Sequence, residues 1–327
     1  MNLGKPLLSI CIPTYNGASS SLDLVLNAAI RIASEYNDVE IIVSDNCSSD
    51  GTKELVSSYI ERFPALQYYR NTENLGFNGN MLKLITYAKG EYAWITGDDD
   101  VINLETFGTI LNTLRANNYD YLSIGFNFAF KEDFVLSDRI GQGTSFIAGS
   151  YADVLLNNCF RGNTLATFMG SSIVRLSMFR AVDTSMIGKE FDCYYNCFPN
   201  AYMIATAFHN AKCAYTKTPY IICVSPKNHK KTYDNLNSWA VIDTNAIVGL
   251  LEYVKSLGVD KKYLKRTEER ISFDYIVTGA RMKVRGMGFP PKYFHYLVKA
   301  FGHPRVIGSL FLKLSNGVFK TKFVPGI

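Results

Sequence analysis

The chain has 327 residues, of which 47% are hydrophobic and 19% charged, and its formal net charge is +5. A chain of this length and composition can bury a large core, and the absence of internal repeats and low-complexity segments excludes a repetitive architecture. No segment has the roughly 18 uninterrupted apolar residues of a membrane-spanning helix, and seven cysteines without a C-x-x-C pair favour a reduced compartment over a disulfide framework.

Strands and helices alternate along the first 105 residues. The expected strands, mostly apolar, aromatic or β-branched, are 7–12, 39–44, 67–70 and 91–96. The expected helices are 21–34, 53–62 and 81–88. A polar loop follows every strand, and this alternation predicts a parallel α/β sheet. Ligands bind at the carboxyl ends of the strands in such sheets, so the loops are expected to line one nucleotide site.

Three adjacent carboxylates, Asp98, Asp99 and Asp100, follow Gly97 at the end of the fourth expected strand. Their charges repel one another and add nothing to a hydrophobic core. A hard divalent cation with oxygen ligands, Mg²⁺ or Mn²⁺, neutralises such a group while it bridges a substrate's phosphates. A solvated acidic turn is the simpler interpretation of an isolated triplet. The other polar loops expected at the same edge favour the metal site.

Four motifs resemble, in order and spacing, the motif series of family 2 glycosyltransferases. They are Ile12–Asn16, Ser44–Asn46 with Ser49–Thr52, Asn74–Gly76 and Gly97–Asp100. The remainder resembles, more loosely, bacterial enzymes that build O-antigen or other surface polysaccharides. The resemblance implies an inverting, metal-dependent enzyme with an α/β fold of the GT-A type, which has a Rossmann-like, mostly parallel central sheet flanked by helices.

The resemblance assigns the polar loops to a nucleotide-sugar donor. It implies that Asp45 accepts an N–H of the base. Asn46 stands where the family usually has a second acid, and Gly79 where related sequences commonly have an arginine, so Arg70 becomes a candidate for the phosphate charge. The residues expected to bind the donor are Pro13, Thr14, Tyr15, Asn16, Asp45, Asn46, Arg70, Asn74, Gly76, Asn80, Asp98, His229 and Lys230.

Two of these assignments have structural alternatives. The turn 13–16 can offer a flat ring and backbone groups to the base, or be an ordinary strand-to-helix turn. His229 and Lys230 belong to a polar, basic loop that either closes over the pyrophosphate or is simply solvated. Within the triplet, Asp99 is expected to be the principal metal ligand. Asp98 contacts the ribose or the metal's water shell, and Asp100 is a second ligand or orients the first.

A carboxylate must take the proton of the acceptor hydroxyl, because an alcohol is a poor nucleophile at neutral pH. Asp192 and then Glu190 are the candidate catalytic bases, with surface charges as the alternative interpretation, and Asp153 and Asp183 are weaker candidates. The strands expected around them, in the acceptor-binding half, are 119–125, 169–174 and 220–224.

The C-terminal region is strongly basic. Residues 253–327 contain 15 lysines and arginines but 4 acidic residues, interleaved with aromatic residues and leucines. This pattern suits a helical tail on an anionic membrane surface. A cap on the core and a homodimer contact are alternatives, and no motif supports nucleic-acid binding. We therefore expect a nucleotide-sugar-binding half (1–105), an acceptor-binding half (106–252) and this tail (253–327).

These features predict transfer of a hexose or deoxyhexose from a nucleotide-sugar to a hydroxyl of a glycan acceptor, by a single metal-assisted displacement. The acceptor is expected to be lipid-linked, and the enzyme to be cytoplasmic and peripheral on the inner face of the membrane. One alternative is a sugar-nucleotide nucleotidyltransferase, which should carry a Gly-rich phosphate loop after its first strand. Another is an inactive binding or scaffold protein, which should have lost the metal carboxylates.

Overall fold

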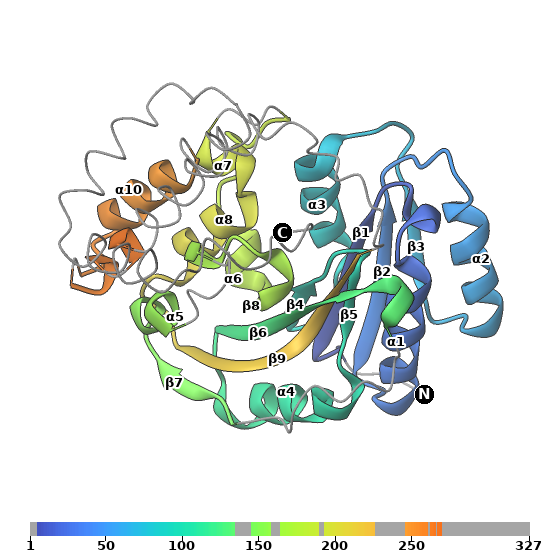
Figure 1. Cartoon of the computed structure of the whole chain (residues 1–327), viewed down its shortest axis with the longest axis horizontal. Helices are drawn as coiled ribbons and strands as arrows, with labels where there is room; N and C mark the ends of the chain where they lie inside the picture. Colours follow the sequence, from blue (N-terminus) through green and yellow to red (C-terminus); the bar gives the residue numbers. More distant parts are fainter. Residues whose placement is uncertain are drawn as a thin grey trace, which may run out of the picture.

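The computed structural model describes residues 5–134, 145–157, 164–189, 193–225, 246–260, 262–265 and 267–269 (Figure 1). Its centre is a nine-stranded sheet in the order β3-β2-β1-β4-β8-β6-β9-β5, with β7 paired to β9. Helices flank this sheet (Figure 1). The α/β fold class predicted from the sequence is therefore confirmed.

The first four strands form the parallel part of the sheet. They are β1 (Leu8–Thr14), β2 (Val39–Asp45), β3 (Gln67–Arg70) and β4 (Tyr92–Ile95). β2 and β4 both pair with β1, and β3 pairs with β2, all in parallel. The helical elements between them are η1 (Gly17–Ser19), α1 (Leu22–Glu35), α2 (Thr52–Arg62) and α3 (Gly76–Tyr87). The expected alternation and parallel pairing are both confirmed.

Helix α3 begins at Gly76 rather than at residue 81 as predicted. Gly76 has a φ of +72°, which glycine adopts without the steric cost that other residues meet. Its N–H donates a hydrogen bond of 2.8 Å to Asn74 Oδ1. The chain therefore enters the helix directly from this turn, and Asn78 and Asn80 become helical residues.

The second half adds strands of mixed direction. They are β5 (Asp100–Ile102), β6 (Tyr121–Phe130), β7 (Ile147–Gly149), β8 (Ser172–Arg175) and β9 (Cys213–Ser225). β8 pairs antiparallel with β4 and β6, and β9 pairs antiparallel with β5 and β7, whereas β6 and β9 are parallel. The sheet thus continues across residue 105, the expected border between the first two units.

The helices of this half pack partly on the mixed part of the sheet and partly on one another. They are α4 (Leu104–Asn117), α5 (Tyr151–Asn157), α6 (Leu176–Arg180), α7 (Tyr194–Cys197), α8 (Pro199–Phe208) and α10 (Val248–Ser256), with the 3-10 turns η2 (Lys131–Asp133), η3 (Thr164–Ala166) and η4 (Met169–Ser171). Within the described ranges, no helix has both the length and the apolar character needed to cross a membrane.

The segment 169–174, which the sequence predicts as one strand, divides into η4 and β8. Trp94 Nε1 donates a hydrogen bond of 2.7 Å to Gly170 O, and the backbone N–H of Ser171 donates to Phe168 O at 3.2 Å. These bonds hold residues 169–171 in a tight turn before the strand begins. The turn brings Gly170 close to the acidic triplet, since a Cβ at Gly170 would lie 2.9 Å from Asp100 Oδ2.

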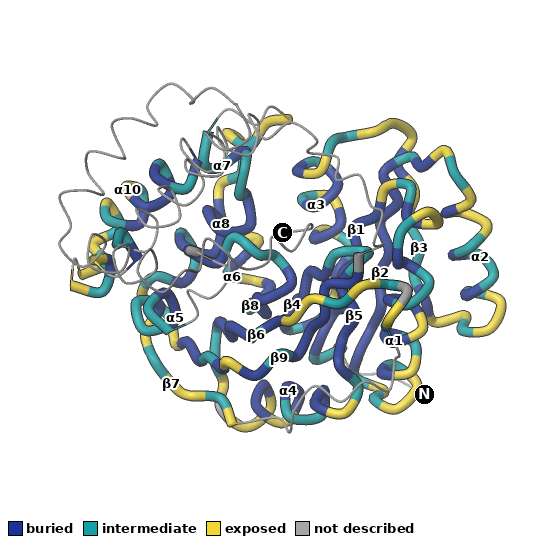
Figure 2. Tube along the Cα trace, in the orientation of Figure 1, coloured by how far each residue is buried: buried dark blue, intermediate teal, exposed yellow. Residues whose placement is uncertain are grey.

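Alternate residues of the central strands pack into two hydrophobic clusters on opposite faces of the sheet. Ile12 of β1 belongs to the cluster that contains Leu26 of α1. Its neighbour Cys11 belongs to the cluster that contains Leu84 of α3 and Ile204 of α8. Strands covered on both faces are continuously apolar rather than alternating, and Figure 2 shows them as the buried centre of the molecule.

Glu40 is a buried carboxylate near the amino-terminal end of β2, and only 8% of it is exposed. Its Oε1 accepts hydrogen bonds from Ser9 Oγ at 2.5 Å and from the backbone N–H groups of Lys89 at 2.6 Å and Gly90 at 3.0 Å. Its Oε2 accepts from Gln67 Nε2 at 2.8 Å. Glu40 therefore joins β1, β3 and the turn before β4 at the end of the sheet opposite to the polar loops.

We expect Glu40→Gln to lower the free energy of unfolding by about 1–2 kcal/mol, because both carboxylate oxygens face donors and the new amide must place its NH₂ against one set of them. Urea denaturation measures this loss. The double variant Glu40→Gln with Gln67→Glu is the control, since it returns one carboxylate and one amide to the pair. A double variant no more stable than the single one would contradict this account.

Candidate functional site

The carboxyl ends of three parallel strands lie in one row. Thr14 at the end of β1 is opposite Asp45 at the end of β2, and Asp45 is opposite Arg70 at the end of β3. Proline has no N–H to donate to a neighbouring strand. Because β4 pairs with β1 only as far as Cys11, Pro13 lies beyond this pairing and no hydrogen bond to β4 is lost. The polar loops begin side by side after this row, at the edge where open α/β sheets bind ligands.

The loop after β4 joins this row through Thr14, whose Oγ1 donates a hydrogen bond of 2.5 Å to Asp98 Oδ2. Gly17 is buried against the pair, and a Cβ at this position would lie 2.2 Å from Thr14 Oγ1 and 3.1 Å from Asp98 Oδ2. Glycine is required here because of space rather than backbone conformation. Gly17 was not among the residues expected at the site, because a glycine that leaves room for a neighbour has no local signal that distinguishes it from a turn glycine.

Asp100 is the first residue of β5, and only 3% of it is exposed. Its Oδ2 accepts a hydrogen bond of 2.8 Å from the N–H of Gly97, and its side chain is also hydrogen-bonded to that of Cys223 on β9. Of the two roles predicted for Asp100, these contacts argue against a second metal ligand. They favour the other role, in which Asp100 holds the turn that carries Asp98 and Asp99.

Asp98 and Asp99 are partly exposed in this turn. Burial, together with the neighbouring charge of Asp99, raises the pKa of Asp98 to about 7, against the opposing effect of the hydrogen bond from Thr14. A cation between two adjacent carboxylates would relieve this mutual repulsion.

The two carboxylates fit a Mg²⁺ or Mn²⁺ ion that takes its other ligands from a substrate and from water. In the part of the chain that the structure describes, no three His, Cys, Asp or Glu side chains are arranged to hold a metal. Mg²⁺ is usually held by one or two carboxylates together with phosphate oxygens rather than by a cage of protein ligands. Asp98 and Asp99 are the residues that would hold such an ion.

Asn46 connects the loop after β2 to the loop after β3. Its Nδ2 donates to Asn74 Oδ1 at 2.8 Å and to Gly76 O at 3.1 Å. Its Oδ1 accepts from the N–H of Leu75 at 2.9 Å and from Asn71 Nδ2 at 3.2 Å. An aspartate would lack the two donors, so the departure from the usual family acid has a structural explanation. Asn46 and Asn74 lie at the predicted edge, but these bonds assign Asn46 to positioning the loop.

Asp45 is fully buried, and both of its oxygens are occupied. Oδ1 accepts from the N–H and the hydroxyl of Ser48 at 2.8 and 2.5 Å, and Oδ2 accepts from the Tyr68 hydroxyl at 2.6 Å. Arg70 Nε lies 3.3 Å from Asp45 Oδ2, and its Nη2 donates to Ser48 O at 2.8 Å. The predicted contact of Asp45 with a base would require these bonds to break. The predicted contact of Arg70 with a phosphate would not, because its side chain is 40% exposed and a guanidinium has five N–H donors.

Tyr15 and Asn16 follow β1 and have different environments. The Tyr15 ring is 51% exposed, as expected for a residue that packs against a base. Asn16 has a φ of 56°, its N–H donates to Ser48 Oγ at 2.8 Å, and its Oδ1 accepts from the N–H of Ser49 at 3.0 Å. Asn16 thereby joins the loops after β1 and β2 and leaves Tyr15 at their exposed surface.

Asn80 is buried in α3 and faces β2 rather than the loops. Its Nδ2 donates to Ser44 O at 3.0 Å, and its Oδ1 accepts from Ser44 Oγ at 2.7 Å and from Asn71 Nδ2 at 2.9 Å. The prediction that Asn80 binds the donor does not fit these contacts. The reason is the earlier start of α3, which turns this residue inward.

The two candidate bases and the basic loop fall outside the described residues. These predictions concern Glu190, Asp192, His229 and Lys230. The weaker base candidates make ordinary turn contacts: Asp153 Oδ2 accepts from the N–H and hydroxyl of Ser150 at 2.9 and 2.7 Å, and Asp183 Oδ1 accepts from the N–H of Ser185 at 2.9 Å.

The residues that flank Glu190 and Asp192 are attached to α3. Asn78 Nδ2 donates to Gly188 O at 2.7 Å and to Asn196 O at 2.8 Å, and the N–H of Gly188 donates to Asn196 Oδ1 at 2.7 Å. A Cβ at Gly76 would lie 3.7 Å from Lys189 Cγ. The segment that carries the candidate bases therefore starts and returns beside the first turn of α3, close to the loop that Asn46 holds.

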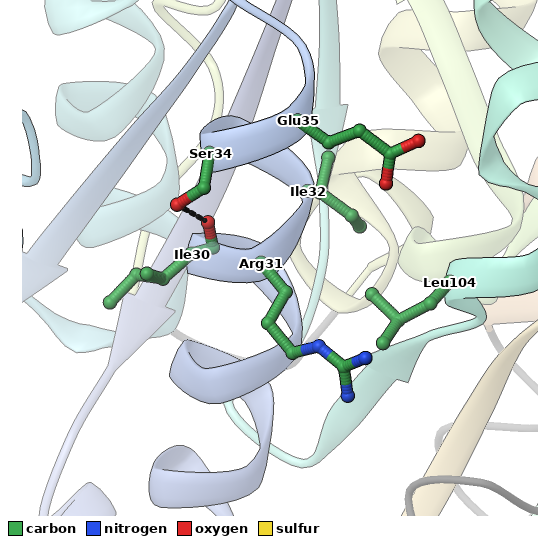
Figure 3. A pocket seen from close by; sticks show the side chains of 6 residues that line it. All are labelled: Ile30, Arg31, Ile32, Ser34, Glu35 and Leu104. Atoms are coloured by element: carbon green, nitrogen blue, oxygen red, sulfur yellow. Dashed lines mark hydrogen bonds between the residues drawn. The ribbon is translucent and has the colours of Figure 1, made fainter.

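A pocket between α1 and α4 lies away from these loops (Figure 3). Its lining residues are Ile30, Arg31, Ile32, Ser34, Glu35 and Leu104. They come from the carboxyl-terminal half of α1 and the first residue of α4. None of them belongs to the predicted site, and the pocket offers no pair of carboxylates for a metal.

Residues 9–180 match the family described as Glycosyl transferase family 2. The chain belongs to this family. The matched residues include the row of strand ends, the acidic triplet and the Gly170 turn. The family that the four motifs resemble is therefore confirmed.

Two relatives of this family 2 protein are named for sugar transfer. Abequosyltransferase RfbV of Salmonella typhimurium is 28% identical over 230 residues, which cover 66% of this chain and 66% of the relative. The GalNAc(5)-diNAcBac-PP-undecaprenol beta-1,3-glucosyltransferase of Campylobacter jejuni is 32% identical over 142 residues, 42% of this chain and 43% of the relative. The chain thus matches at most about two thirds of the length of these two relatives.

Two solved structures have a similar fold. S. aureus TarS 1-349 in complex with UDP-GlcNAc has a TM-score of 0.52 at 17% identity, over 83% of this chain and 81% of that one. The mannosyltransferase PcManGT of Pyrobaculum calidifontis, in complex with GDP-Man and Mn²⁺, has a TM-score of 0.53 at 16% identity, over 97% and 81%. These similarities support the GT-A type of α/β fold for this family 2 chain.

Proposed function

We propose that this family 2 protein transfers a sugar from a nucleotide-sugar donor to a hydroxyl of a glycan acceptor, with inversion of the anomeric centre. The observation that carries the proposal is the hydrogen bond from Thr14 to Asp98, because it joins the loop after β1 to the pair of partly exposed carboxylates. The open ring of Tyr15 lies in the same loop. In this proposal the base packs against Tyr15 and the diphosphate lies beside the acidic pair.

Asp98 and Asp99 hold the divalent cation in this proposal, and Thr14 and Asp100 fix their positions. A bound Mn²⁺ or Mg²⁺ supplies Lewis-acid stabilisation of the negative charge on the departing nucleoside diphosphate. The bond between the anomeric carbon and the phosphate oxygen breaks as the acceptor oxygen attacks from the opposite face. A carboxylate takes the proton of that hydroxyl, and no covalent intermediate with the protein forms.

Asp192 is our first candidate for that carboxylate, and Glu190 the second. Their neighbours in the chain support this choice, because the carbonyl groups of Gly188 and Asn196 both accept hydrogen bonds from Asn78 near the start of α3. A segment anchored there begins near the same edge as the acidic pair. The base would then approach from the acceptor side.

The acceptor is proposed to be a lipid-linked glycan, and the donor sugar a hexose or deoxyhexose. The support is the names of the relatives, one of which is an abequosyltransferase and the other a glucosyltransferase named for an undecaprenol-linked compound. The basic residues of 253–327 are proposed to contact an anionic membrane surface on the cytoplasmic side.

A thermal-shift screen tests the donor site. Wild-type protein is heated with UDP-, GDP-, CDP- and dTDP-sugars, each with and without Mn²⁺. We expect one nucleotide to raise the Tm only when Mn²⁺ is present, because a ligand at a hundred times its Kd stabilises a folded protein by about 2.7 kcal/mol. If no nucleotide gives a metal-dependent shift, the proposed donor site is wrong.

A further inference from the structure

Three phenylalanines alternate along the carboxyl-terminal part of β6 and form what we call the aromatic strip: Phe126, Phe128 and Phe130. They are 9%, 56% and 38% exposed, so the strip runs from the core to the surface. Alternate residues of a strand point to the same face. Large apolar side chains gathered at a surface commonly mark a place where another molecule binds.

The register of the sheet places the strip on the same face as the side chain of Asp100. Phe128 is opposite Cys223 on β9, and Cys223 is opposite Asp100 on β5. Directly opposed residues share a face, and the hydrogen bond between the Cys223 and Asp100 side chains agrees with this arrangement. Phe128 is therefore two strand spacings, about 10 Å, from the acidic triplet.

Aromatic contacts fill the space between the strip and the triplet. The Phe126 ring is 4.3 Å from the Phe168 ring, and a Cβ at Gly170 would lie 3.1 Å from Phe168 Cζ and 2.9 Å from Asp100 Oδ2. The Phe126 and Phe128 rings are 5.4 Å apart at 85°. In such an edge-to-face pair at most one face of Phe128 is covered by its partner, so at least one face stays clear of Phe126.

We propose that the aromatic strip binds a sugar ring of the acceptor glycan, with an open face of Phe128 packed against the C–H face of the ring. This inference rests on the proposed function. The C–H face of a pyranose is apolar and carries a slight positive charge, which matches the negative face of an aromatic ring. The hydroxyls at the rim of the sugar stay free to be attacked or hydrogen-bonded.

The position of the strip favours a sugar over a hydrocarbon chain. The attacking hydroxyl must reach the anomeric carbon of a donor whose diphosphate lies at the acidic pair. A group about 10 Å from the triplet on the same face is therefore within reach of the accepting sugar or its neighbour. In a lipid-linked acceptor the hydrocarbon is separated from that hydroxyl by at least one sugar and a phosphate. The lipid is thus expected further from the triplet than Phe128.

Saturation-transfer NMR tests the inference with the methyl glycosides of glucose, galactose, mannose and N-acetylglucosamine, in the presence of Mg²⁺, which is diamagnetic, and a mixture of UDP, GDP, CDP and dTDP. We expect at least one glycoside to bind, with the strongest transfer to its ring C–H protons. Phe128→Ala should weaken that binding by about tenfold or more, and Phe128→Trp should preserve it. The matched control is Ile147→Ala, because Ile147 is 55% exposed but pairs with the opposite end of β9.

Three results would overturn the inference: no glycoside binds the wild type, Phe128→Ala binds as tightly as the wild type, or Ile147→Ala weakens binding equally. The inference is also overturned if Phe128→Ala reduces only the binding of phosphatidylethanolamine–phosphatidylglycerol vesicles, because the strip would then contact lipid. The metal-dependent thermal shift with nucleotide-sugars is recorded on separate aliquots of the same protein preparations, without nucleoside diphosphates. If that shift persists while glycoside binding is absent, the inference fails and the donor site stands; if both are absent, the proposed function fails.

Discussion

Replacing Asp99 by alanine is expected to lower kcat/KM for sugar transfer by about a thousandfold, a loss of about 4 kcal/mol in transition-state stabilisation. Asp99 is one of the two partly exposed carboxylates in the triplet, and Asp98 alone cannot supply the charge of the pair. The rate is measured as release of nucleoside diphosphate from the nucleotide-sugar that gives the metal-dependent thermal shift. The same variant should lose that shift.

The stability of Asp99→Ala without metal separates a functional role from a structural one. The charge of Asp99 raises the pKa of Asp98, which means that the two carboxylates repel each other in the folded protein. Removing Asp99 should therefore leave the free energy of unfolding unchanged or increase it. Glu105→Ala is the matched control, since Glu105 is an exposed acid in the first turn of α4. A variant at Asp99 that keeps its metal-dependent shift would exclude it as a ligand.

Gly17→Ala is expected to weaken donor binding by about tenfold to a hundredfold and to lower the free energy of unfolding by about 1–3 kcal/mol. The new methyl group would lie 2.2 Å from Thr14 Oγ1 and 2.9 Å from Leu22 Cδ2. Thr14 must then move away from Asp98, and the carboxylate loses the bond that fixes it. Urea denaturation and the nucleotide thermal shift measure the two effects.

Two further variants show whether Gly17→Ala acts through this contact. Gly51→Ala is the matched control, because the nearest atom to its new methyl group is Ala18 Cβ at 3.8 Å, so it carries no overpacking cost and donor binding should be unchanged. Thr14→Val keeps the shape of Thr14 but removes the hydroxyl, and it should weaken donor binding without an overpacking cost. Unchanged donor binding in Thr14→Val would argue against the role of the Thr14–Asp98 bond.

The parallel half of the fold could be predicted because its signals are local. β1, β2 and β3 are short segments that end in polar loops, and α2 starts within one residue of its predicted position. Strand-helix alternation then leaves few ways to arrange the elements, so the edge shared by the loops follows from their order. No comparable rule fixes the order and direction of the strands in the mixed half. There the predicted strand 119–125 proved too short, because β6 extends to Phe130.

The roles of individual polar residues were harder to predict than their positions. Asp45, Asn46 and Asn80 all lie after or beside a strand end, as predicted. Each nevertheless forms its hydrogen bonds with neighbouring loops or strands. A polar residue in such a loop has the same sequence signature whether it faces a ligand or another loop. The distinction depends on contacts between residues far apart in the chain, such as Asn46 with Gly76, which no local pattern contains.

Asn78 gives the protein a natural boundary for exchanging its acceptor-side residues. One amide group binds Gly188 O and Asn196 O, so two residues on either side of the candidate bases are attached at a single point. The entropy of closing a loop between fixed ends changes slowly with loop length, by about 0.6 kcal/mol for each doubling. Insertions between Lys189 and Cys193 are therefore expected to cost little in the rest of the fold, whereas Tyr194 packs against Tyr202 and Tyr253. Specificity for a new acceptor could evolve there, or be grafted there, while the sheet and the acidic pair stay unchanged.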